Sequence, residues 1–544
     1  MISHSDLTTL IPSSGSINSA CNYNLACKDP GSLNIGSSLA ISEIQKNIET
    51  KIILSIKEKK ETIYQFKPFE NIKFVEIGNT KNITETISKS LKHVTTKWCL
   101  INPITTIPSS KKINDSFIEF GLNKLPKENW ASICFDKNKN PIFLTKSDKN
   151  SYGLMSYPFT GRILAKTEDI KMAINKLNDF EKNDLINLAK KLFEVKEIKI
   201  IHNIWLDIGH LATYPITRIT SINSRFFNKF FFDKQKNTIK KKSNNKTKIK
   251  QEIFFYKTIP NEIKRYFPMI FSVSKSKEEI SYEMEYISKP NLSEIYLFGS
   301  IGPNAVLRIF NSIKRVFQTL YDKEYFAKEN ASWLYSLKTI KRQSQIKKII
   351  EIEDYKILDK IYNNDFILNN LRFPSLKKTF SLLEKKLNYF ENNRPLHIGH
   401  GDLCFNNILV DPLFGTINLI DPKAEKHVQL KKYGLIDSLY DLSKLNHSIE
   451  GFYDSIVNNL FTLNINNFQN ISLEVYKPPE YEIYNLYFKN IMAEKIDNEN
   501  LKLLTGNLFL SMLPMHLDNI ERVISLALLG SIYMSEYNIK QIFK

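Results

Sequence analysis

The segment from His400 to Asp421 constrains the fold of this chain more than any other. It reads HGDLCFNNILVDPLFGTINLID, so polar residues flank two short apolar runs. Ile408 to Val410 and Ile417 to Ile420 have the pattern of two strands joined by a turn that contains Pro and Gly. This pattern predicts a hairpin with Asn407 and Asp421 close together at its open end.

The polar side chains of this segment are the types that phosphoryl transfer requires. Moving a γ-phosphoryl group to a hydroxyl needs one acceptor that orients the attacking O–H, and oxygen ligands for the magnesium that neutralises the phosphates. Asp402 can orient the hydroxyl, and Asn407 and Asp421 can bind the metal. The alternative interpretation is an ordinary loop with polar turn residues.

The same residues resemble the aminoglycoside phosphotransferase and choline kinase family, which is related to the protein kinases. The catalytic loop of that family reads HGD with Asn five residues after the Asp, and Tyr440-Asp441-Leu442 is similar to its downstream YDLA-type segment. The resemblance implies ATP as the phosphoryl donor, Asp402 as the catalytic residue and Asn407 with Asp421 as Mg²⁺ ligands. It also makes the Asp of the YDL segment a buried structural carboxylate. Pro422-Lys423 replaces the aromatic residue and Gly expected after the metal Asp.

A kinase also needs a strand lysine that reaches the α- and β-phosphates and a glutamate on the next helix that holds it. The sequence predicts two strands joined at Asp233 to Asn237, and alternation along the second favours Lys241, with Lys240 as the second choice. The helix expected at Lys248 to Tyr256 offers Glu252 as the partner. A solvated basic hairpin is the simpler reading of the same lysines.

The segment SYEMEYI resembles the last strand of the family's amino-terminal lobe, which leads into the hinge. By that resemblance, backbone groups of Glu285 and Ile287 would meet the edge of the adenine ring. Residues 303 to 395 have apolar residues at helical spacing and are predicted to form a helical bundle. Further candidates for acceptor contacts, each also explicable as ordinary surface or core, are Asp437, His447, Glu450 and Tyr453.

The first third of the chain alternates strand-like and helical patterns, which favours a parallel sheet with helices on both faces and a ligand site at the carboxyl ends of its strands. The expected strands are Lys51–Ile56, Phe74–Ile77, Trp98–Ile101 and Ser132–Phe135, with a helix at Thr84–His93.

Two segments of this region resemble sugar nucleotidyltransferases: TGRIL (Thr160 to Leu164) and WLDIGHLATY (Trp205 to Tyr214). The resemblance implies that Asp207 is one of two metal carboxylates, and that the ligand is a nucleotide-sugar or a sugar phosphate. However, Asn102-Pro103 stands where the second carboxylate is expected, and the opening SSGSINSAC lacks the family's glycine-rich motif. A retained binding surface, or a structural role in which Asp207 anchors a loop, is therefore favoured over active nucleotidyl transfer.

Composition places the chain among globular cytosolic proteins. Its formal charge is +19, but the lysines are spread along all 544 residues, so no nucleic-acid partner is expected. The five cysteines have no disulfide or zinc spacing. The sequence shows neither a membrane span nor a signal peptide, so a cytoplasmic location is expected.

Together these patterns predict a Rossmann-like α/β, nucleotidyltransferase-like domain over residues 1–216, followed by a bilobal kinase-like fold with lobes at 217–290 and 291–544. The expected function is ATP- and Mg²⁺-dependent phosphorylation of a hydroxyl on a sugar, polyol or amino alcohol. Such a pairing of domains resembles proteins of bacterial capsule and surface-polysaccharide biosynthesis. The alternatives are a sugar-phosphate nucleotidyltransferase, a bifunctional enzyme with both activities, and a non-catalytic scaffold that binds glycan or nucleotide.

Overall fold

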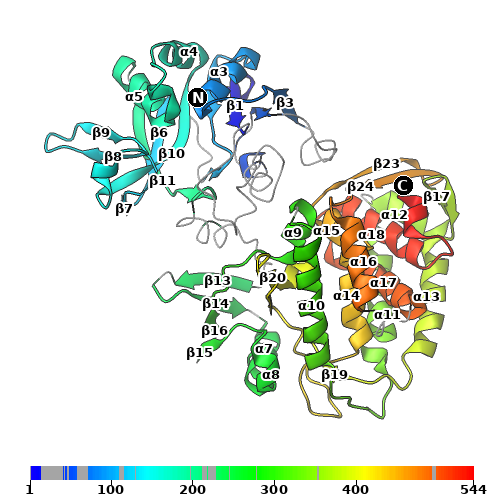
Figure 1. The fold of residues 1–544 in the computed structure, drawn as a ribbon. Coiled ribbons are helices and arrows are strands. Elements are labelled where there is room, and N and C mark those ends of the chain that lie inside the picture. The colour runs from blue at the N-terminus through cyan, green and yellow to red at the C-terminus, as the bar shows by residue number, and fades with distance from the viewer. Residues whose placement is uncertain are drawn as a thin grey trace. The chain divides into compact units, whose positions relative to one another are not determined.

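The computed structural model divides into two compact units, Met1–Ile222 and Asn223–Lys544 (Figure 1). The residues it describes are 2–13, 41, 43–45, 48, 50–57, 71–108, 115–128, 130–196, 198–210, 217, 228–233, 235–243, 245–276, 279–299, 301–351, 355–492 and 498–543. Within them, no helix combines the length and the hydropathy needed to cross a membrane. Cys99, Cys134 and Cys404 are free thiols, whereas the other two cysteines lie outside the described ranges.

The first unit is built on a ten-stranded sheet whose main order is β11-β6-β10-β4-β1-β2-β3. Strands β1 to β4 are parallel to their neighbours within this group, but β10 runs antiparallel to both β4 and β6. The sheet is therefore mixed, and the prediction of a parallel sheet was wrong for this part. An apolar run fits a buried strand in either direction, so the sequence pattern does not determine strand direction. The main strands are β1 (Leu7–Pro12), β2 (Lys51–Ile56), β3 (Ile72–Glu76), β4 (Trp98–Ile101), β6 (Phe117–Gly121), β10 (Met155–Lys166) and β11 (Lys199–Asn203).

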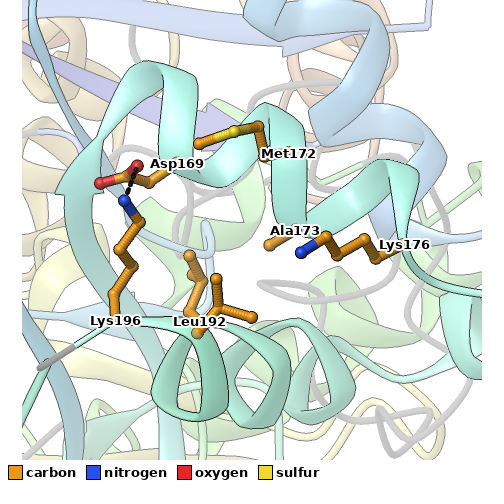
Figure 2. Close-up of a pocket in the computed structure, with 7 residues that line it drawn as sticks. Asp169, Met172, Ala173, Lys176, Leu192 and Lys196 are labelled. Atoms are coloured by element: carbon orange, nitrogen blue, oxygen red, sulfur yellow. Dashed lines mark ion pairs between the residues drawn. The ribbon is translucent and has the colours of Figure 1, made fainter.

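Shorter strands extend this sheet beside β10: β7 (Leu125–Pro126), β8 (Ser132–Phe135) and β9 (Pro141–Leu144). Helices α3 (Ile83–Ser90) and α5 (Leu185–Val195) begin at the N-caps Asn82 and Asp184, whose side chains accept backbone N–H groups. A hollow lies between α4 (Thr167–Asn175) and α5, and an ion pair between Asp169 and Lys196 crosses it at 3.0 Å (Figure 2). Its other lining residues are apolar apart from Lys176.

The second unit begins with a four-stranded antiparallel sheet in the order β13-β14-β16-β15. Its strands are β13 (Asn228–Asp233), β14 (Thr238–Ser243), β15 (Ile270–Lys275) and β16 (Ile280–Glu285). The predicted hairpin is present, since β13 and β14 pair directly and the connection spans residues 234–237. Helices α7 (Lys246–Thr258) and α8 (Asn261–Lys264) follow β14.

The rest of this unit is largely helical. On α10 (Pro303–Leu320), the six apolar residues whose helical spacing predicts a buried face are all 2% exposed or less: Val306, Ile309, Ile313, Val316, Phe317 and Leu320. The other helices are α9 (Leu292–Phe298), α11 (Ser336–Ile349), α12 (Lys356–Asn363), α13 (Leu376–Phe390), α14 (Ser438–Ile449), α15 (Tyr453–Val457), α16 (Tyr481–Ile491), α17 (Asn498–Met512), α18 (Ile520–Tyr533) and α19 (Ile539–Ile542). A small sheet joins β17 (Phe366–Leu368), β18 (Leu371–Phe373), β23 (Phe461–Asn467) and β24 (Asn470–Val475).

The hairpin predicted from the HGD segment is also present. Strands β20 (Ile408–Val410) and β21 (Ile417–Leu419) are antiparallel, with Ile408 opposite Leu419. The preceding β19 (His397–Ile398) pairs with β22 (Leu435–Ile436), and a single 3₁₀ turn, η9 (Phe405–Asn407), leads into β20. The fold class expected from the sequence, an α/β unit followed by a two-part sheet-and-helix unit, is confirmed.

Candidate active site

Lys241 joins the sheet of the second unit to its helical part through two carboxylates. Its Nζ lies 2.8 Å from Oε2 of Glu252, on α7, and 2.7 Å from Oδ1 of Asp421, two residues beyond β21. The side chains of Lys241 and Glu252 are 3% and 2% exposed, whereas that of Asp421 is 40% exposed. Lys240, on the opposite face of β14, is less buried, so Lys241 is the strand lysine that meets both acids.

These contacts determine the charge state of Lys241 and Asp421. Burial disfavours the ammonium form, but the charges of Asp421 and Glu252 outweigh burial and raise the pKa of Lys241 above its ordinary value. Burial also disfavours the Asp421 carboxylate, yet Lys241 lowers the pKa of Asp421 below its ordinary value. Lys241 and Asp421 therefore form a charged pair near neutral pH. The phenol of Tyr282 donates a further hydrogen bond to Oε2 of Glu252, at 3.0 Å.

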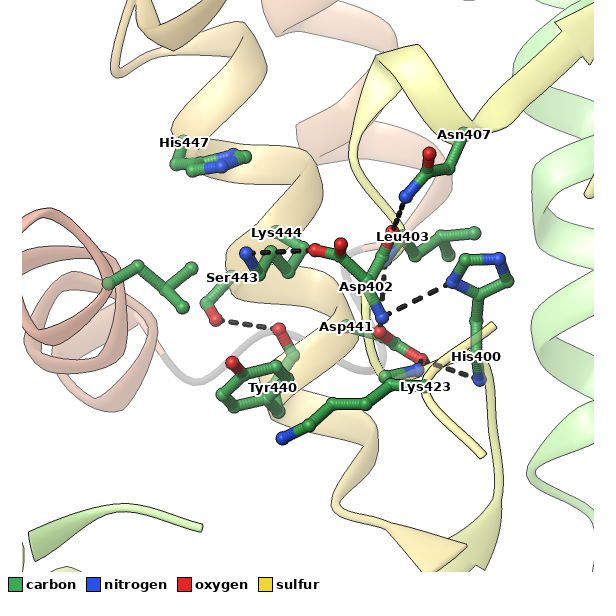
Figure 3. Close-up of polar contacts among 12 residues, drawn as sticks. His400, Asp402, Leu403, Asn407, Lys423, Tyr440, Asp441, Ser443, Lys444 and His447 are labelled. Carbon is green, nitrogen blue, oxygen red and sulfur yellow. Dashed lines mark hydrogen bonds and ion pairs between the residues drawn. The ribbon is translucent and has the colours of Figure 1, made fainter. Parts of the chain in front are cut away.

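Asp402 lies in the loop between β19 and η9, where it pairs with a lysine from α14. Its Oδ1 lies 2.9 Å from Nζ of Lys444 (Figure 3), and the two side chains are 35% and 12% exposed. Desolvation opposes the charge on Asp402, but Lys444 outweighs desolvation and holds the pKa of Asp402 well below its usual range. In the same way, desolvation opposes the charge on Lys444 and Asp402 overcomes it, so the pKa of Lys444 is raised.

Buried Asp441 holds the backbone of the HGDL loop in place. Its Oδ2 accepts the N–H groups of His400, at 3.0 Å, and Gly401, at 2.9 Å. Its Oδ1 accepts the N–H of Leu403 at 3.3 Å, and the phenol of Tyr321 also donates to Oδ2. These four donors satisfy a carboxylate that is 0% exposed, which agrees with the structural role implied by the resemblance.

Two further features fix the shape of this loop. Gly401 has φ +74°, and a Cβ added there would lie 2.8 Å from Cβ of Lys423, so a larger residue would be strained. The ring of His400 accepts the N–H of Asp402 at Nδ1, at 3.2 Å, and contacts the C=O of Ile420 at Nε2, at 2.9 Å. Because Nδ1 accepts, Nε2 must carry the hydrogen. His400 thereby connects the catalytic loop to the residue before the second acid.

Asn407 and Asp421 supply the oxygen donors that the sequence assigned to a metal. The amide NH₂ of Asn407 donates to the backbone C=O of Asp402 at 2.8 Å, which leaves its amide oxygen for a cation. The N–H of Ile420 donates to the backbone C=O of Asn407 at 3.0 Å, so the hairpin brings the two segments together. One amide oxygen and one partly exposed carboxylate fit Mg²⁺, which keeps substrate phosphates and water as its other ligands. The described residues contain no cluster of three His, Cys, Asp or Glu that could hold a metal without such help.

The backbone at the end of β16 has two groups already in use. The N–H of Glu285 donates to the C=O of Met269 at 2.9 Å, and the C=O of Ile287 accepts the N–H of Lys289 at 2.9 Å. A bound base would therefore have to use the C=O of Glu285 and the N–H of Ile287.

The four candidates for acceptor contacts divide into two kinds. Asp437 is 0% exposed, caps α14 and accepts from Arg394 at 2.7 Å, so it is a structural carboxylate. Glu450 forms an ion pair with Lys489. In contrast, His447 lies on α14 one turn beyond Lys444, and its ring stacks on Tyr453 at a centroid distance of 4.3 Å. Of these four candidates, His447 and Tyr453 lie near Asp402 and have no ion pair among the described residues.

In the first unit, Asp207 is held by its own loop. Its Oδ2 accepts the N–H groups of Gly209 and His210 and lies 2.8 Å from the ring Nδ1 of His210, and the residue is 1% exposed. Asn102, at the end of β4, is 0% exposed and donates its NH₂ to the C=O groups of Pro103 and Thr106, each at 2.9 Å. Both side chains therefore support loop structure, and a metal role for Asp207 stays a prediction. The opening segment SSGSINSAC lies outside the described residues, apart from its first serine.

Sequence reasoning did not single out Lys444, Tyr321 or Lys338. Lys444 had a usable signal, because it stands three residues after Asp441 in YDLSKL and therefore about one helical turn along the same face. The other two come from α10 and α11 or their ends, and nothing in their local sequence indicates that they approach the loop.

No protein-family model matches the chain, and no curated protein matches it. Among solved structures, it is similar to a spectinomycin phosphotransferase in complex with ADP and spectinomycin, with 13% identity, TM-score 0.34 and coverage of 59% of this chain and 89% of the other. It is also similar to an ethanolamine kinase from Plasmodium vivax, with 13% identity, TM-score 0.27 and coverage of 68% and 92%. A UDP-glucose pyrophosphorylase complexed with UDP-glucose gives 11% identity, TM-score 0.31 and coverage of 40% and 99%. The similar solved structures thus include both kinds of protein that the sequence resembles, phosphotransferases and nucleotidyltransferases.

Proposed function

We propose that residues 217–544 form a kinase-like module that transfers the γ-phosphoryl group of ATP to a hydroxyl of a small molecule. The observation that carries this proposal is the double contact of Lys241 with Glu252 and Asp421, because it links the strand, helix and hairpin positions that phosphoryl transfer needs. The link between Asn407 and Asp402 adds the catalytic loop to the same constellation.

In this mechanism, Glu252 keeps the ammonium of Lys241 oriented so that it can bind the α- and β-phosphates. The base would lie against the backbone C=O of Glu285 and N–H of Ile287. Asn407 and Asp421 would hold Mg²⁺, which would neutralise negative charge on the phosphates when bound. The contact with Lys241 neutralises the carboxylate of Asp421.

Asp402 accepts a hydrogen bond from the acceptor hydroxyl. This bond directs the hydroxyl oxygen toward the γ-phosphorus. A new O–P bond forms as the bond from the γ-phosphorus to the β–γ bridging oxygen breaks, which yields ADP and a phosphate ester. Because its pKa is held low, Asp402 is a weak base, so it orients the hydroxyl and accepts the proton late in the transfer. Asp441 fixes the backbone of the HGDL loop that carries Asp402, so the carboxylate of Asp402 keeps its position without reorganisation.

The experiment is a screen of sugars, polyols and amino alcohols for acceptor-dependent ADP release, with Asp402→Ala beside the wild type. We expect the substitution to lower kcat by about 10²–10⁴-fold, the usual contribution of a positioned acid–base group. Asp518→Ala is the control, since Asp518 is an exposed carboxylate of the same unit that forms an ion pair with Arg522. Acceptor-dependent ADP release that survives in Asp402→Ala would remove this mechanism.

In the part of the first unit that the structure describes, Asp207 and Asn102 are both engaged in their own loops, so we do not propose nucleotidyl transfer. Pyrophosphate release from a nucleoside triphosphate and a sugar phosphate would contradict this reading.

A further inference from the structure

Two lysines, Lys338 and Lys423, contact Tyr440 close to Asp402, and the charges of Lys444 and Arg342 act on Lys338. Nζ of Lys338, on α11, donates to the phenol oxygen of Tyr440 at 2.7 Å and lies 5.1 Å from its ring centroid. Nζ of Lys423 lies 5.9 Å from the same centroid, and Figure 3 shows its side chain passing along Tyr440. Lys444 comes from the next turn of α14, and Arg342 from the next turn of α11 after Lys338.

Two of these four cationic side chains, Lys444 and Lys423, form ion pairs with nearby carboxylates. Asp402 pairs with Lys444 at 2.9 Å, and the exposed Glu425 pairs with Lys423 at 3.6 Å. Among the described residues, neither Lys338 nor Arg342 has a carboxylate within ion-pair distance, and the guanidinium of Arg342 contacts only Gln345 and Met515.

This uncompensated charge is unfavourable without a ligand. Burial, and then the neighbouring charge of Lys444, lower the pKa of Lys338 to about 8. The opposite charge of a bound anion would offset both effects by favouring the ammonium form, whereas a cationic acceptor would add a further like charge within a few ångströms. Tyr440, Lys444 and His447 are spaced on one face of α14, so the cluster is continuous with the stacked ring of His447.

We propose that the acceptor of this site is a hydroxylated small molecule that carries an anionic group, which binds to Lys338 and Arg342 while its hydroxyl meets Asp402. This inference rests on the proposed function, because it takes Asp402 as the residue that orients the hydroxyl. It excludes choline-like and polycationic acceptors, because Asp402 and the exposed Glu425 are the acidic side chains that pair with this cluster among the described residues.

The test is a lysine footprint on the full chain, with acetic anhydride as the reagent and peptide mapping as the readout. Near the pKa of Lys338, inorganic phosphate should slow acetylation of this residue about threefold or more relative to sodium chloride of equal ionic strength, since a bound anion raises the pKa of an ammonium group. Choline chloride should have no such effect. Lys341, an exposed lysine of the same helix, is the internal reference. Equal rates in phosphate and chloride, or protection by choline, would overturn the proposal.

Two variants connect the footprint to the cluster. Arg342→Gln should weaken the protection by phosphate, whereas Lys347→Gln, at an exposed position of α11, should leave it unchanged. Equal loss or equal retention of protection in the two variants would contradict binding at Arg342. Calorimetric titration of the same protein with ATP and magnesium tests the proposed function separately. Footprint protection without ATP binding would reject the kinase and keep the anion site, and ATP binding without protection would do the reverse.

Discussion

Replacing Glu252 by Gln tests whether burial, and not distance, decides what the ion pairs of Lys241 contribute to stability. The two contacts of Lys241 have almost the same length, 2.8 Å to Glu252 and 2.7 Å to Asp421. At an effective dielectric constant of about 20, Coulomb's law gives either contact about 6 kcal/mol of gross attraction. Distance therefore predicts equal effects for the two substitutions.

Burial predicts unequal effects. Glu252 and Lys241 are nearly inaccessible, and breaking a buried pair by neutralising one partner costs about 3–5 kcal/mol. Glu252→Gln keeps hydrogen-bonding atoms, so we expect the free energy of unfolding of the second unit to fall by about 3 kcal/mol, at the lower end of that range. Asp421 is 40% exposed and has φ +54°, a conformation that Asn tolerates well. Asp421→Asn should therefore cost less than about 1 kcal/mol, as exposed pairs do, while ADP release is lost.

The assay is pulse proteolysis in urea, with the cleaved fragments assigning the transition to residues 223–544. Glu279→Gln is the matched control. Glu279 forms a 2.7 Å ion pair with Lys242, the neighbour of Lys241 on β14, and both side chains of that pair are partly exposed. It should change the unfolding free energy by less than about 1 kcal/mol and leave ADP release intact. If Asp421→Asn destabilises the unit as much as Glu252→Gln does, the reasoning from burial is wrong.

Three further substitutions have expected outcomes. Tyr321→Phe removes one donor from Asp441 and should lower the unfolding free energy by about 1.5–3 kcal/mol, measured in urea, because the acceptor is buried and charged. Burial raises the pKa of Asp454 to about 6, although nearby serine hydroxyls oppose this shift. In the unfolded chain the pKa of an Asp is about 3.9, so between these two values Asp454 is protonated in the native state and ionised in the unfolded state. Stability should therefore fall as pH rises from about 4 to 6 and stay at the lower value above it, and Asp454→Asn should add about 2–3 kcal/mol at neutral pH and remove that slope in urea titrations. Asp207→Asn should destabilise the first unit by about 1–2 kcal/mol through lost loop contacts and leave ADP release unchanged. A fall in ADP release would instead mean that the two units are coupled.

Local patterns predicted many elements well. The expected strands at Lys51–Ile56, Trp98–Ile101, Ser132–Phe135 and Ile408–Val410 have the observed bounds, because each is a short apolar run with a clear boundary. The helix expected at Lys248 to Tyr256 lies within α7, and alternation along β14 distinguished Lys241 from Lys240. The predicted parallel direction was wrong for β10, since its apolar signal is the same in either orientation.

The sequence pattern did not predict the side chains that reach the site through long-range contacts. The motif located Asp402, but its partner Lys444 comes from a helix that begins after a connection of irregular structure, and periodicity there indicates only a buried face. Lys338 lies about a hundred residues before Tyr440, so their contact depends on how α11 packs beside α14. Which side chains neutralise a catalytic carboxylate is thus a property of packing, and not of the motif that contains it.

The two carboxylates that we propose take part in phosphoryl transfer share one electrostatic arrangement. Each is paired with a lysine from a different element, Asp421 with Lys241 and Asp402 with Lys444. A phosphate group that enters between them can take over either ammonium, because a lysine that leaves a carboxylate for a phosphate keeps a charge-assisted hydrogen bond. In the proposed mechanism, Asp421 would then be available to a metal ion and Asp402 to the acceptor hydroxyl. The cations therefore need no rearrangement of the backbone to change partners, and the cost of desolvating them is already met by folding.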